Sequence, residues 1–298
     1  MKNVIVTGAN GFIGSSMVKK LVENKVNVIA LDISFENSHL QESNYITKIE
    51  THLDDAEELS SKIPTNNYDA FFHFAWKGVN GADKSDPFVQ INNTQMAIKC
   101  ASFAKKINCK KFLCAGTVAE QATYSLHNLE KTSGGMMYGV AKHCTRLMLE
   151  NYCKNIGLDF IWMQFSNIYG PNNKTGNLVS YTIGELINGK DAIFGPALQP
   201  YDFIYVDDLI DAVYRLGKCN NSKNFYFIGS GEPRILKNYL FEIGKQMGKE
   251  DKIKIGIRPD DGIVYSMDMF KTESLINDIG NYVSKSFTEG IRYTLKNY

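Results

Sequence analysis

The sequence predicts an α/β fold built on a doubly wound parallel sheet, with a smaller C-terminal lobe interleaved with it. Short apolar runs alternate with longer amphipathic runs through residues 1–166. Short links join these runs, as expected where helices connect parallel strands and cover both faces of the sheet. After about residue 166 the loops lengthen, and breakers such as Gly170-Pro171 and Gly195-Pro196 interrupt the pattern.

The elements of the first part follow from the spacing of apolar residues. Apolar runs predict six strands over residues 4–7, 26–32, 45–51, 70–75, 111–115 and 160–165. Apolar residues at helical spacing predict four helices over residues 11–23, 54–62, 86–107 and 136–156. We therefore expect residues 1–166 to form one domain.

The C-terminal part is expected to return to this domain before it completes the smaller lobe. An apolar run predicts a strand over residues 202–206, and Asp207 is expected to cap a helix that ends at Leu216. A strand over residues 225–229 and a helix over residues 235–247 follow. We assign residues 201–228 to the first domain, and residues 167–200 and 229–298 to the lobe.

The composition argues against several classes of function. With 33 basic and 32 acidic residues the net charge is +1, and no charge run suggests nucleic acid or a membrane surface. No apolar run approaches membrane-spanning length, and the first residues resemble a strand rather than a signal peptide. The six cysteines form no CxxC pair and no metal-ligand spacing with the five histidines, so we expect no metal site, and reduced thiols in a cytoplasmic protein.

Gly8, Gly11 and Gly14 form a GxxGxxG segment between the first predicted strand and the first predicted helix. Glycine allows a tight turn and a close approach of the backbone to a pyrophosphate, which the helix N-terminus then faces. The segment predicts a dinucleotide site of the Rossmann type. The same turn adds Asn10, Phe12 and Ile13 to the expected cofactor-binding residues.

Asp32 ends the second predicted strand, 18 residues after Gly14. A carboxylate at that position accepts hydrogen bonds from the adenosine ribose hydroxyls and repels a 2′-phosphate. No arginine occurs in residues 33–36. We therefore expect NAD(H) to be favoured over NADP(H); the alternative role for Asp32 is a loop cap.

Tyr138 and Lys142 stand four residues apart on a predicted helix, so they share one face. A free tyrosine has a pKa of about 10 and is a poor base, but a lysine one turn away favours the phenolate. Tyr138 could then exchange a proton with a sugar or alcohol oxygen while a hydride moves to or from a nicotinamide. Thr117, just beyond the fifth predicted strand, is the candidate for a third group that hydrogen-bonds the same oxygen.

These motifs resemble the extended short-chain dehydrogenase/reductases of the nucleotide-sugar epimerase/dehydratase family. The resemblance covers nearly the whole chain. The matching segments are TGANGFIG (7–14), FHFA (72–75), FLCAGT (112–117), YGVAK (138–142), SNIYGP (166–171), DFIYVDD (202–208) and RPDD (258–261). The resemblance implies a nucleotide-diphosphate sugar as substrate, oxidised or reduced at C4.

Further site residues are expected on the same basis. Those expected at the cofactor are His52, Leu53, Phe74, Ala75, Trp76 and Asn92, together with Tyr138 and Lys142. Those expected at the substrate are Thr117, Asn167, Tyr201 and Arg258. Trp76 could wall the sugar pocket or be a packed indole.

Three positions depart from the family pattern. His52 stands where the family usually has an acidic residue, and Gln164 and Tyr201 stand in place of two arginines. The arginine at the position of Tyr201 commonly binds the diphosphate. Other groups are then expected to bind it, such as Lys174, Lys190 or Arg258.

The residues after Thr117 narrow the reaction. Dehydratases of the family carry an Asp-Glu pair there, whereas this chain has Val118-Ala119-Glu120, so 4,6-dehydration is not expected. The Cys and His of the epimerase-reductases that make GDP-fucose are not evident either, because Cys114 falls within a strand and no His follows Pro171. Two reactions remain, reduction of a 4-ketone and 4-epimerisation.

The choice between these two reactions stays open. The short tail after residue 258 and segment 116–120 favour a reductase of a 4-keto-6-deoxyhexose nucleotide, such as dTDP-4-dehydro-6-deoxyglucose. Asp32 favours a 4-epimerase that holds NAD tightly. A non-catalytic NAD(H) sensor typically loses the tyrosine or the lysine, so the presence of Thr117, Tyr138 and Lys142 together argues against it.

A homodimer is expected from the resemblance. In the family, the helices that correspond to residues 86–107 and 136–156 commonly pair with their copies. The alternative is that these faces only cover their own sheet. The expected apolar contributors to a dimer are Ala97, Cys100, Ala101, Phe103, Ala104, Leu147 and Met148.

Overall fold

The computed structural model describes residues 1–128, 135–173, 176–260 and 265–298, and it confirms the predicted α/β fold. The strands of the central sheet are β1 Asn3–Thr7, β2 Asn27–Asp32, β3 Ile46–Glu50, β4 Ala70–His73, β5 Lys111–Thr117, β6 Asp159–Phe165 and β11 Phe225–Ile228. They are all parallel and lie in the order β11-β6-β5-β4-β1-β2-β3. The strand order reverses between β1 and β4, where doubly wound sheets bind their ligands.

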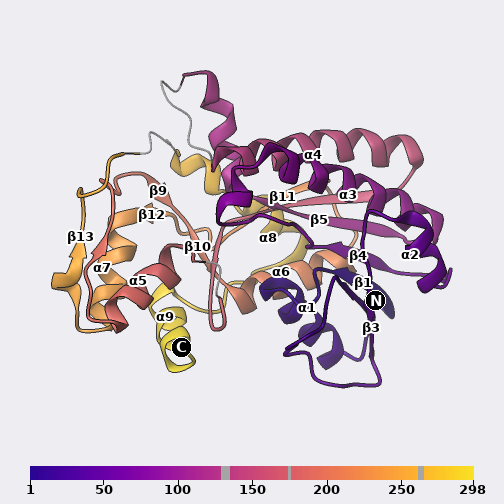
Figure 1. Ribbon diagram of the computed structural model, residues 1–298, viewed down its shortest axis with the longest axis horizontal. Helices are drawn as coiled ribbons and strands as arrows, with labels where there is room; N and C mark the ends of the chain where they lie inside the picture. The colour runs from indigo at the N-terminus through magenta and orange to yellow at the C-terminus, as the bar shows by residue number, and fades with distance from the viewer. Residues whose placement is uncertain (129–134, 174–175, 261–264) are drawn as a thin grey trace.

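Helices cover both faces of this sheet (Figure 1). Helices α1 Phe12–Glu23 and α6 Val206–Lys218 pack together on one face, and α2 Ala56–Lys62, α3 Pro87–Lys106 and α4 Met136–Ile156 cover the other. Side chains alternate along the strands, so that Val4 and Val6 join one hydrophobic cluster and Ile5 joins the other. Each layer of helices therefore closes a hydrophobic core of its own.

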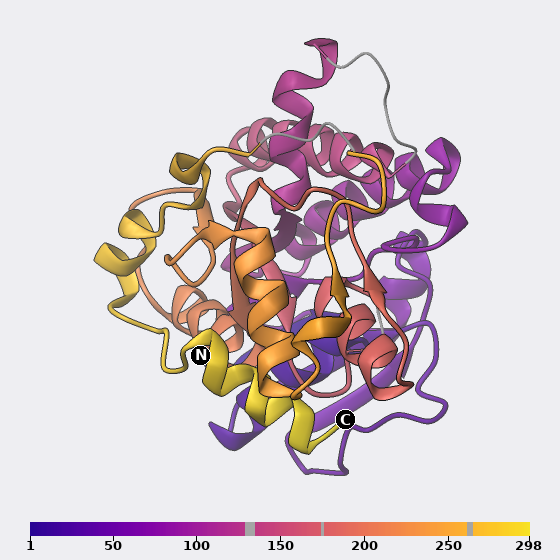
Figure 2. The same ribbon diagram turned by 90° about the vertical axis from the view of Figure 1, so that its left-hand side faces the viewer.

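A smaller lobe lies beyond the carboxyl ends of the central strands (Figures 1 and 2). It contains α5 Leu178–Ile187, α7 Leu236–Gln246 and α9 Phe287–Lys296, while α8 Glu273–Ile279 packs on α6 and β11. Its short strands are β7 Asn167–Tyr169, β8 Ala192–Ile193, β9 Pro200–Tyr201, β10 Phe203–Tyr205, β12 Arg234–Ile235 and β13 Ile253–Lys254. The 3₁₀ helices of the described residues are η1 Ala82–Lys84, η2 Val118–Asn128, η3 Glu250–Lys252 and η4 Met267–Phe270.

An aromatic cluster forms the core of this lobe. The ring centroids of Tyr239 and Phe287 lie 4.6 Å apart, and those of Phe203 and Tyr239 lie 4.9 Å apart. Within residues 201–228, β11 joins the central sheet, whereas β10 pairs with β7. The domain boundaries proposed from the sequence stay a prediction.

Two strand ends differ from the predicted ones by two residues, and both differences shape the site. β5 continues through Thr117 instead of ending at residue 115, so this residue belongs to the strand rather than to the loop after it. β4 ends at His73 instead of continuing to residue 75, because the Ala75 amide turns away and donates to Thr7 Oγ1 at 3.3 Å. Gly8 permits this turn, since a Cβ on Gly8 would lie 2.8 Å from the Ala75 nitrogen.

The predicted capping role of Asp207 is wrong. The residue that precedes α6 is Tyr205, whose side chain makes no capping hydrogen bond, and Asp207 lies in the first turn of the helix. A negative charge there still interacts favourably with the helix dipole. The neighbouring carboxylate of Asp208 accepts a hydrogen bond from Ser284 Oγ at 2.6 Å, which ties α6 to the segment before α9.

The prediction that a dimer interface includes certain apolar residues of α3 is wrong for five of them. They are Ala97, Cys100, Ala101, Phe103 and Ala104, and all are buried against the chain's own sheet. Four of them recur at helical spacing on the face of α3 that covers the strands, which explains their burial without a partner. Leu147 and Met148 on α4 are 49% and 47% exposed.

Two other expectations concerned reduced thiols and the lack of a membrane-spanning segment. All six cysteines are free, and Cys114 is buried within β5, where burial raises its pKa to about 12. Across the described part of the chain, no helix combines the length and the apolar character that a membrane crossing requires.

Candidate active site

The turn between β1 and α1 forms a cradle of bare backbone. Gly8 has a φ of +64°, and a Cβ on Gly14 would lie only 1.9 Å from the Gly8 carbonyl oxygen. Gly11 precedes α1, and no side chain caps the helix, which leaves N–H groups of the first turn available to an anion. The cradle therefore fits the pyrophosphate of a dinucleotide.

Asp32 lies beside this cradle, at the end of β2. Its Oδ2 accepts a hydrogen bond from the Asn10 backbone N–H at 2.8 Å, and its Oδ1 accepts one from the Ile33 N–H at 2.8 Å. The Asn10 side chain donates to the Ser34 carbonyl at 3.0 Å. Each carboxylate oxygen can accept a second hydrogen bond, so the loop contacts of Asp32 leave room for a ribose hydroxyl.

The other residues expected at the cofactor differ in their surroundings. Phe12, Ile13 and Phe74 are partly buried and pack against the core, and Leu53 is buried. His52 is exposed on the loop that precedes α2. No single feature of the sequence predicts which of these residues are buried and which are exposed, because all of them follow strand ends or begin a helix.

The structure does not bring Asn92 to the site. Asn92 is exposed on α3, whereas Gln90 and Asn93 face inward. Gln90 Oε1 accepts a hydrogen bond from Trp76 Nε1 at 2.9 Å, and Asn93 Oδ1 accepts one from the Lys77 N–H at 2.8 Å. Residues 90 and 93 share a helix face that residue 92 does not, so the expectation for Asn92 chose the wrong face.

Thr117, Tyr138 and Lys142 come together where β5 ends and α4 begins. The Thr117 hydroxyl is hydrogen-bonded to the Tyr138 phenol. Lys142 Nζ donates to the Ala115 carbonyl at 2.7 Å and lies 5.9 Å from the centroid of the Tyr138 ring. This geometry places a hydroxyl, a phenol and an ammonium group in one cluster.

Burial alters the acidity of two members of this cluster. It raises the pKa of Tyr138, and the hydrogen bond from Thr117 works in the opposite direction. It lowers the pKa of Lys142 to about 8. The phenol is therefore protonated at neutral pH, while the ammonium group is held near its point of titration.

Trp76 and Lys84 line the same cluster. Lys142 Nζ lies 3.6 Å from the centroid of a Trp76 ring, and the indole meets the Tyr138 ring edge-on at 6.2 Å. Lys84 Nζ, from η1, lies 5.6 Å from the Tyr138 centroid, and burial lowers its pKa. No motif singles out Lys84, which lies in the connection between β4 and α3.

A buried carboxyl group lies directly behind Thr117. The side chain of Glu120 has no exposed surface, and its Oε1 accepts a hydrogen bond from the Thr117 backbone N–H at 2.6 Å. Burial raises the pKa of Glu120 to about 7. From the sequence, Glu120 counted as a departure from the dehydratase pattern and as the end of segment 116–120, which favoured a reductase; its position three residues after a candidate hydroxyl was the available signal.

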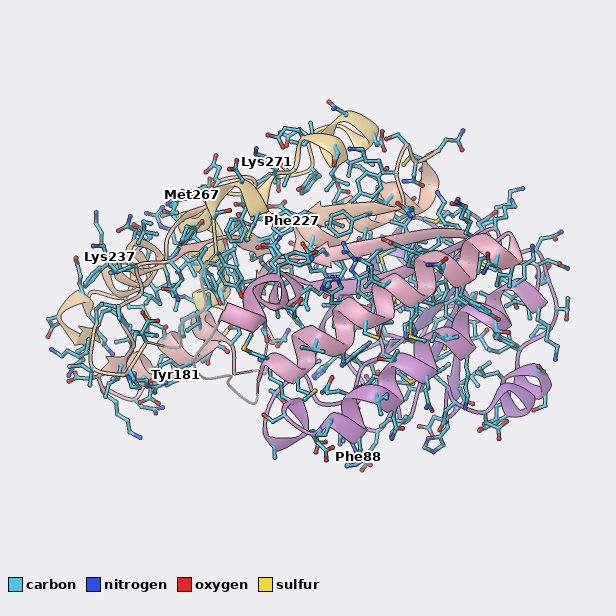
Figure 3. All side chains as sticks on the ribbon, turned by 90° about the horizontal axis from the view of Figure 1, so that it is seen from above. Phe88, Tyr181, Phe227, Lys237, Met267 and Lys271 are labelled. Atoms are coloured by element: carbon cyan, nitrogen blue, oxygen red, sulfur yellow. The ribbon has the colours of Figure 1, made fainter. Side chains whose placement is uncertain are left out.

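A cavity of about 370 Å³ in the C-terminal lobe contains two of the residues expected at the substrate, Tyr201 and Arg258. Aromatic rings of Phe194 and Tyr265 also line it. Arg258 Nη2 donates to the Tyr181 hydroxyl at 2.9 Å, on α5, at the lobe end of the molecule in Figure 3. The cavity therefore combines flat apolar walls with one guanidinium group.

The remaining substrate candidates lie elsewhere or are not described. Asn167 Nδ2 donates to the Asp202 carbonyl at 3.1 Å, and Asn167 does not line this cavity. Gln164 is buried and donates to Glu120 at 3.2 Å, so it is not exposed to a diphosphate. Lys190 is exposed after the end of α5, and Lys174 lies outside the described residues.

Comparisons with known proteins show what the chain resembles in sequence. The model of the "NAD dependent epimerase/dehydratase family" matches residues 4–229. A putative UDP-glucose 4-epimerase of Methanocaldococcus jannaschii is 27% identical over 287 residues, which cover 91% of this chain and 92% of that protein. The dTDP-4-dehydro-6-deoxyglucose reductase of Escherichia coli is 24% identical over 262 residues, which cover 83% of this chain and 82% of that protein.

A solved structure shares the fold over the whole chain. The UDP-glucose 4-epimerase of Thermotoga maritima, crystallised with UDP-glucose, superposes with a TM-score of 0.81 at 22% identity. The match covers 99% of this chain and 97% of that chain. The architecture is therefore shared even where few residues are identical.

Proposed function

The chain belongs to the NAD dependent epimerase/dehydratase family, and from this membership we propose that it reduces the C4 ketone of a nucleotide-diphosphate 4-keto-6-deoxyhexose, such as dTDP-4-dehydro-6-deoxyglucose. The observation that carries the proposal is the contact between Thr117, Tyr138 and Lys142 at the carboxyl edge of the sheet. The named reductase among the similar proteins supports the choice of reaction.

The cofactor in this proposal is NADH. Gly8, Gly11 and Gly14 would hold its pyrophosphate, and Asp32 its adenosine ribose. When bound, the nicotinamide supplies the hydride. The carboxylate of Asp32 repels the 2′-phosphate of NADPH, and the neighbouring Ile33, 71% exposed, offers no positive charge to that phosphate.

Tyr138 is the proton donor in this proposal. Its phenol is protonated at neutral pH, which suits a reduction, because the C4 oxygen needs a proton as the ketone becomes an alcohol. Thr117 hydrogen-bonds the phenol and orients it. Lys142, held by the Ala115 carbonyl, stabilises the phenolate that remains after the proton has left.

The cavity in the C-terminal lobe is the proposed nucleotide subsite. Phe194, Tyr201 and Tyr265 offer ring faces against which a base can stack. Arg258 offers a guanidinium group, which matches phosphate oxygens in geometry and charge. Arg258 would then take the place of the arginine that Tyr201 replaces in the family pattern.

A 4-epimerase is the second candidate. Asp32 favours tightly held NAD, as such an enzyme requires, and three of the similar proteins are named as UDP-glucose 4-epimerases, one of them as a putative one. A non-catalytic NAD(H) sensor is disfavoured, because Thr117, Tyr138 and Lys142 keep their mutual contacts.

The deciding experiment mixes the purified protein with NADH and dTDP-4-dehydro-6-deoxyglucose and follows the absorbance of the reduced nicotinamide. We expect one NADH consumed per sugar, a 6-deoxyhexose product, and at least about tenfold lower kcat/KM with NADPH, because of Asp32. No net loss of NADH, together with interconversion of UDP-glucose and UDP-galactose, would establish the epimerase instead.

We also propose a homodimer formed by α3 and α4, in the cytoplasm, where the six thiols would stay reduced. Figure 3 shows these helices side by side on the near face, with Phe88 at the outer edge of α3. Leu147 and Met148 are exposed on α4, and Ile91 is 56% exposed on α3.

The dimer is tested by placing charge on this face. Leu147→Glu/Met148→Glu should convert the protein from dimer to monomer in sedimentation velocity, because burying two carboxylates in an apolar interface costs several kcal/mol. The matched control is Ile276→Glu, at a side chain that is 40% exposed on α8, and it should leave the sedimentation coefficient unchanged. A wild-type protein that sediments as a monomer contradicts the proposal.

A further inference from the structure

Glu120 is a buried carboxyl group that the proposed mechanism does not use. Three N–H groups point at it. Oε1 accepts from the Thr117 backbone at 2.6 Å, and Oε2 accepts from Trp162 Nε1 at 3.0 Å and from Gln164 Nε2 at 3.2 Å. Since these three partners are all donors, the ionised carboxylate, which only accepts, satisfies them best.

The backbone packs closely around Glu120, which leaves its side chain little room for another conformation. A Cβ on Gly116 would lie 2.6 Å from Glu120 Oε1, so the end of β5 passes directly over the carboxylate. On the other side of the turn, a Cβ on Gly139 would lie 2.5 Å from the Ala119 carbonyl oxygen. The turn over residues 117–120 is therefore wedged between β6 and the first turn of α4, beside Tyr138.

We infer that Glu120 is a positioning residue, whose carboxylate holds the backbone of Thr117 so that the Thr117 hydroxyl meets the Tyr138 phenol. The inference rests on the proposed function, in which this hydroxyl and this phenol act on the sugar. Glu120 acts through Thr117, because its oxygen atoms already accept hydrogen bonds from protein groups. A displacement of about 1 Å at such a group can lower a rate about a hundredfold.

Protonation of Glu120 weakens this contact. The titratable and charged groups that surround Glu120 are Cys114, on β5, and Tyr138, Lys142 and Arg146, on α4. Burial raises the pKa of Glu120 to about 7, although the Thr117 N–H and the positive charges of Lys142 and Arg146 act to lower it. Below that pH the carboxyl gains a proton, which must point at one of its donors, so kcat should fall as the pH drops through about 7.

The inference predicts a specific loss in Glu120→Gln. This variant keeps the side-chain volume but turns an NH₂ group toward a donor, and we expect kcat for the 4-keto sugar to fall about 10- to 100-fold. The KM values should change less than about threefold, and the fall of kcat below pH 7 should disappear.

A double-variant cycle tests the route of the effect. In the Thr117→Val background, Glu120→Gln should cost less than about threefold in kcat, because the hydroxyl that Glu120 positions is already gone. If the fall of kcat in the double variant equals the product of the falls in the two single variants, the inference is overturned.

Gln121→Leu is the matched control for a merely structural role. Gln121 lies in the same turn, and its Nε2 donates to Gln164 Oε1 at 2.9 Å and to the Met269 carbonyl at 2.8 Å. Its loss should lower Tm about as much as Glu120→Gln but leave kcat within about twofold. An equal loss of kcat in both variants would reduce Glu120 to a structural residue.

A measurement without substrate separates a failed inference from a failed proposed function. In protein labelled with nitrogen-15 threonine, the Thr117 amide proton should titrate with a midpoint near pH 7, and should not titrate in Glu120→Gln. If the chemical shift of the Thr117 amide proton does not change with pH in the wild-type protein, the inference is contradicted, whichever substrate the enzyme reduces. A titrating amide without reductase activity supports the contact and rejects the proposed reaction.

Discussion

Tyr138→Phe should lower kcat for the 4-keto sugar about a thousandfold, since the variant lacks the group that delivers the proton. The phenylalanine keeps the ring that meets Trp76 edge-on, so folding and NADH affinity should change little. Single-turnover reduction measures the chemical step, and fluorescence titration with NADH measures binding.

Tyr124→Phe is the matched control for this variant. Tyr124 is 50% exposed on η2, and its hydroxyl accepts a hydrogen bond from Arg146 Nη2 at 3.2 Å. Loss of one exposed hydroxyl should leave kcat within about twofold. If Tyr138→Phe keeps more than about a tenth of the wild-type kcat, another group donates the proton.

Gly14→Ala should abolish useful binding of NAD, with the Kd raised at least about a hundredfold. The added Cβ would lie 1.9 Å from the Gly8 carbonyl oxygen and 2.9 Å from Ala9 Cα. Both of these atoms belong to the backbone, so no change of rotamer relieves the clash, and the turn must open. Calorimetric titration with NAD measures the loss, and a thermal melt shows whether the fold survives.

Gly184→Ala provides the control for that prediction. Gly184 lies within α5, where a Cβ would meet only the Tyr298 hydroxyl, at 3.5 Å. Alanine is the better helix former by about 1 kcal/mol, so Tm should hold or rise while NAD binding stays unchanged. NAD affinity within about threefold of wild type in Gly14→Ala would remove this turn from the cofactor site.

The central sheet and the glycine turn could be predicted because their signals are local. A strand, a tight turn and a helix each leave a pattern within a few residues, and Gly8, Gly11 and Gly14 carry that pattern in order. Tyr138 and Lys142 share a helix face for the same reason. Their contact with Thr117 required only the rule that carboxyl ends of parallel strands meet at one edge.

The errors arose where two partners could satisfy the same pattern. The apolar face of α3 that includes Ala97 and Ala101 packs on its own sheet, although the same spacing would suit a second copy. Asn92 and Asn93 are adjacent, and only the helix register decides which faces the loop after β4. The position of Lys84 depends on contacts between distant elements, which no local spacing reports. The same is true of the contacts that Glu120 makes with Trp162 and Gln164 on β6.

The C-terminal lobe was the least predictable part for a physical reason. Strands such as β8 Ala192–Ile193 and β9 Pro200–Tyr201 are too short to show any alternation. They exist because each finds one partner strand, and those partners come from later in the chain. Only the fold as a whole selects such pairs.

The aromatic cluster of that lobe determines the order in which the two parts of the protein can fold during synthesis. Its rings come from Phe203, Tyr239 and Phe287, so the cluster cannot close until residue 287 has left the ribosome. Every strand of the central sheet has been synthesised by residue 228. The nascent chain can therefore complete its dinucleotide-binding half first and use it as the surface on which the lobe condenses.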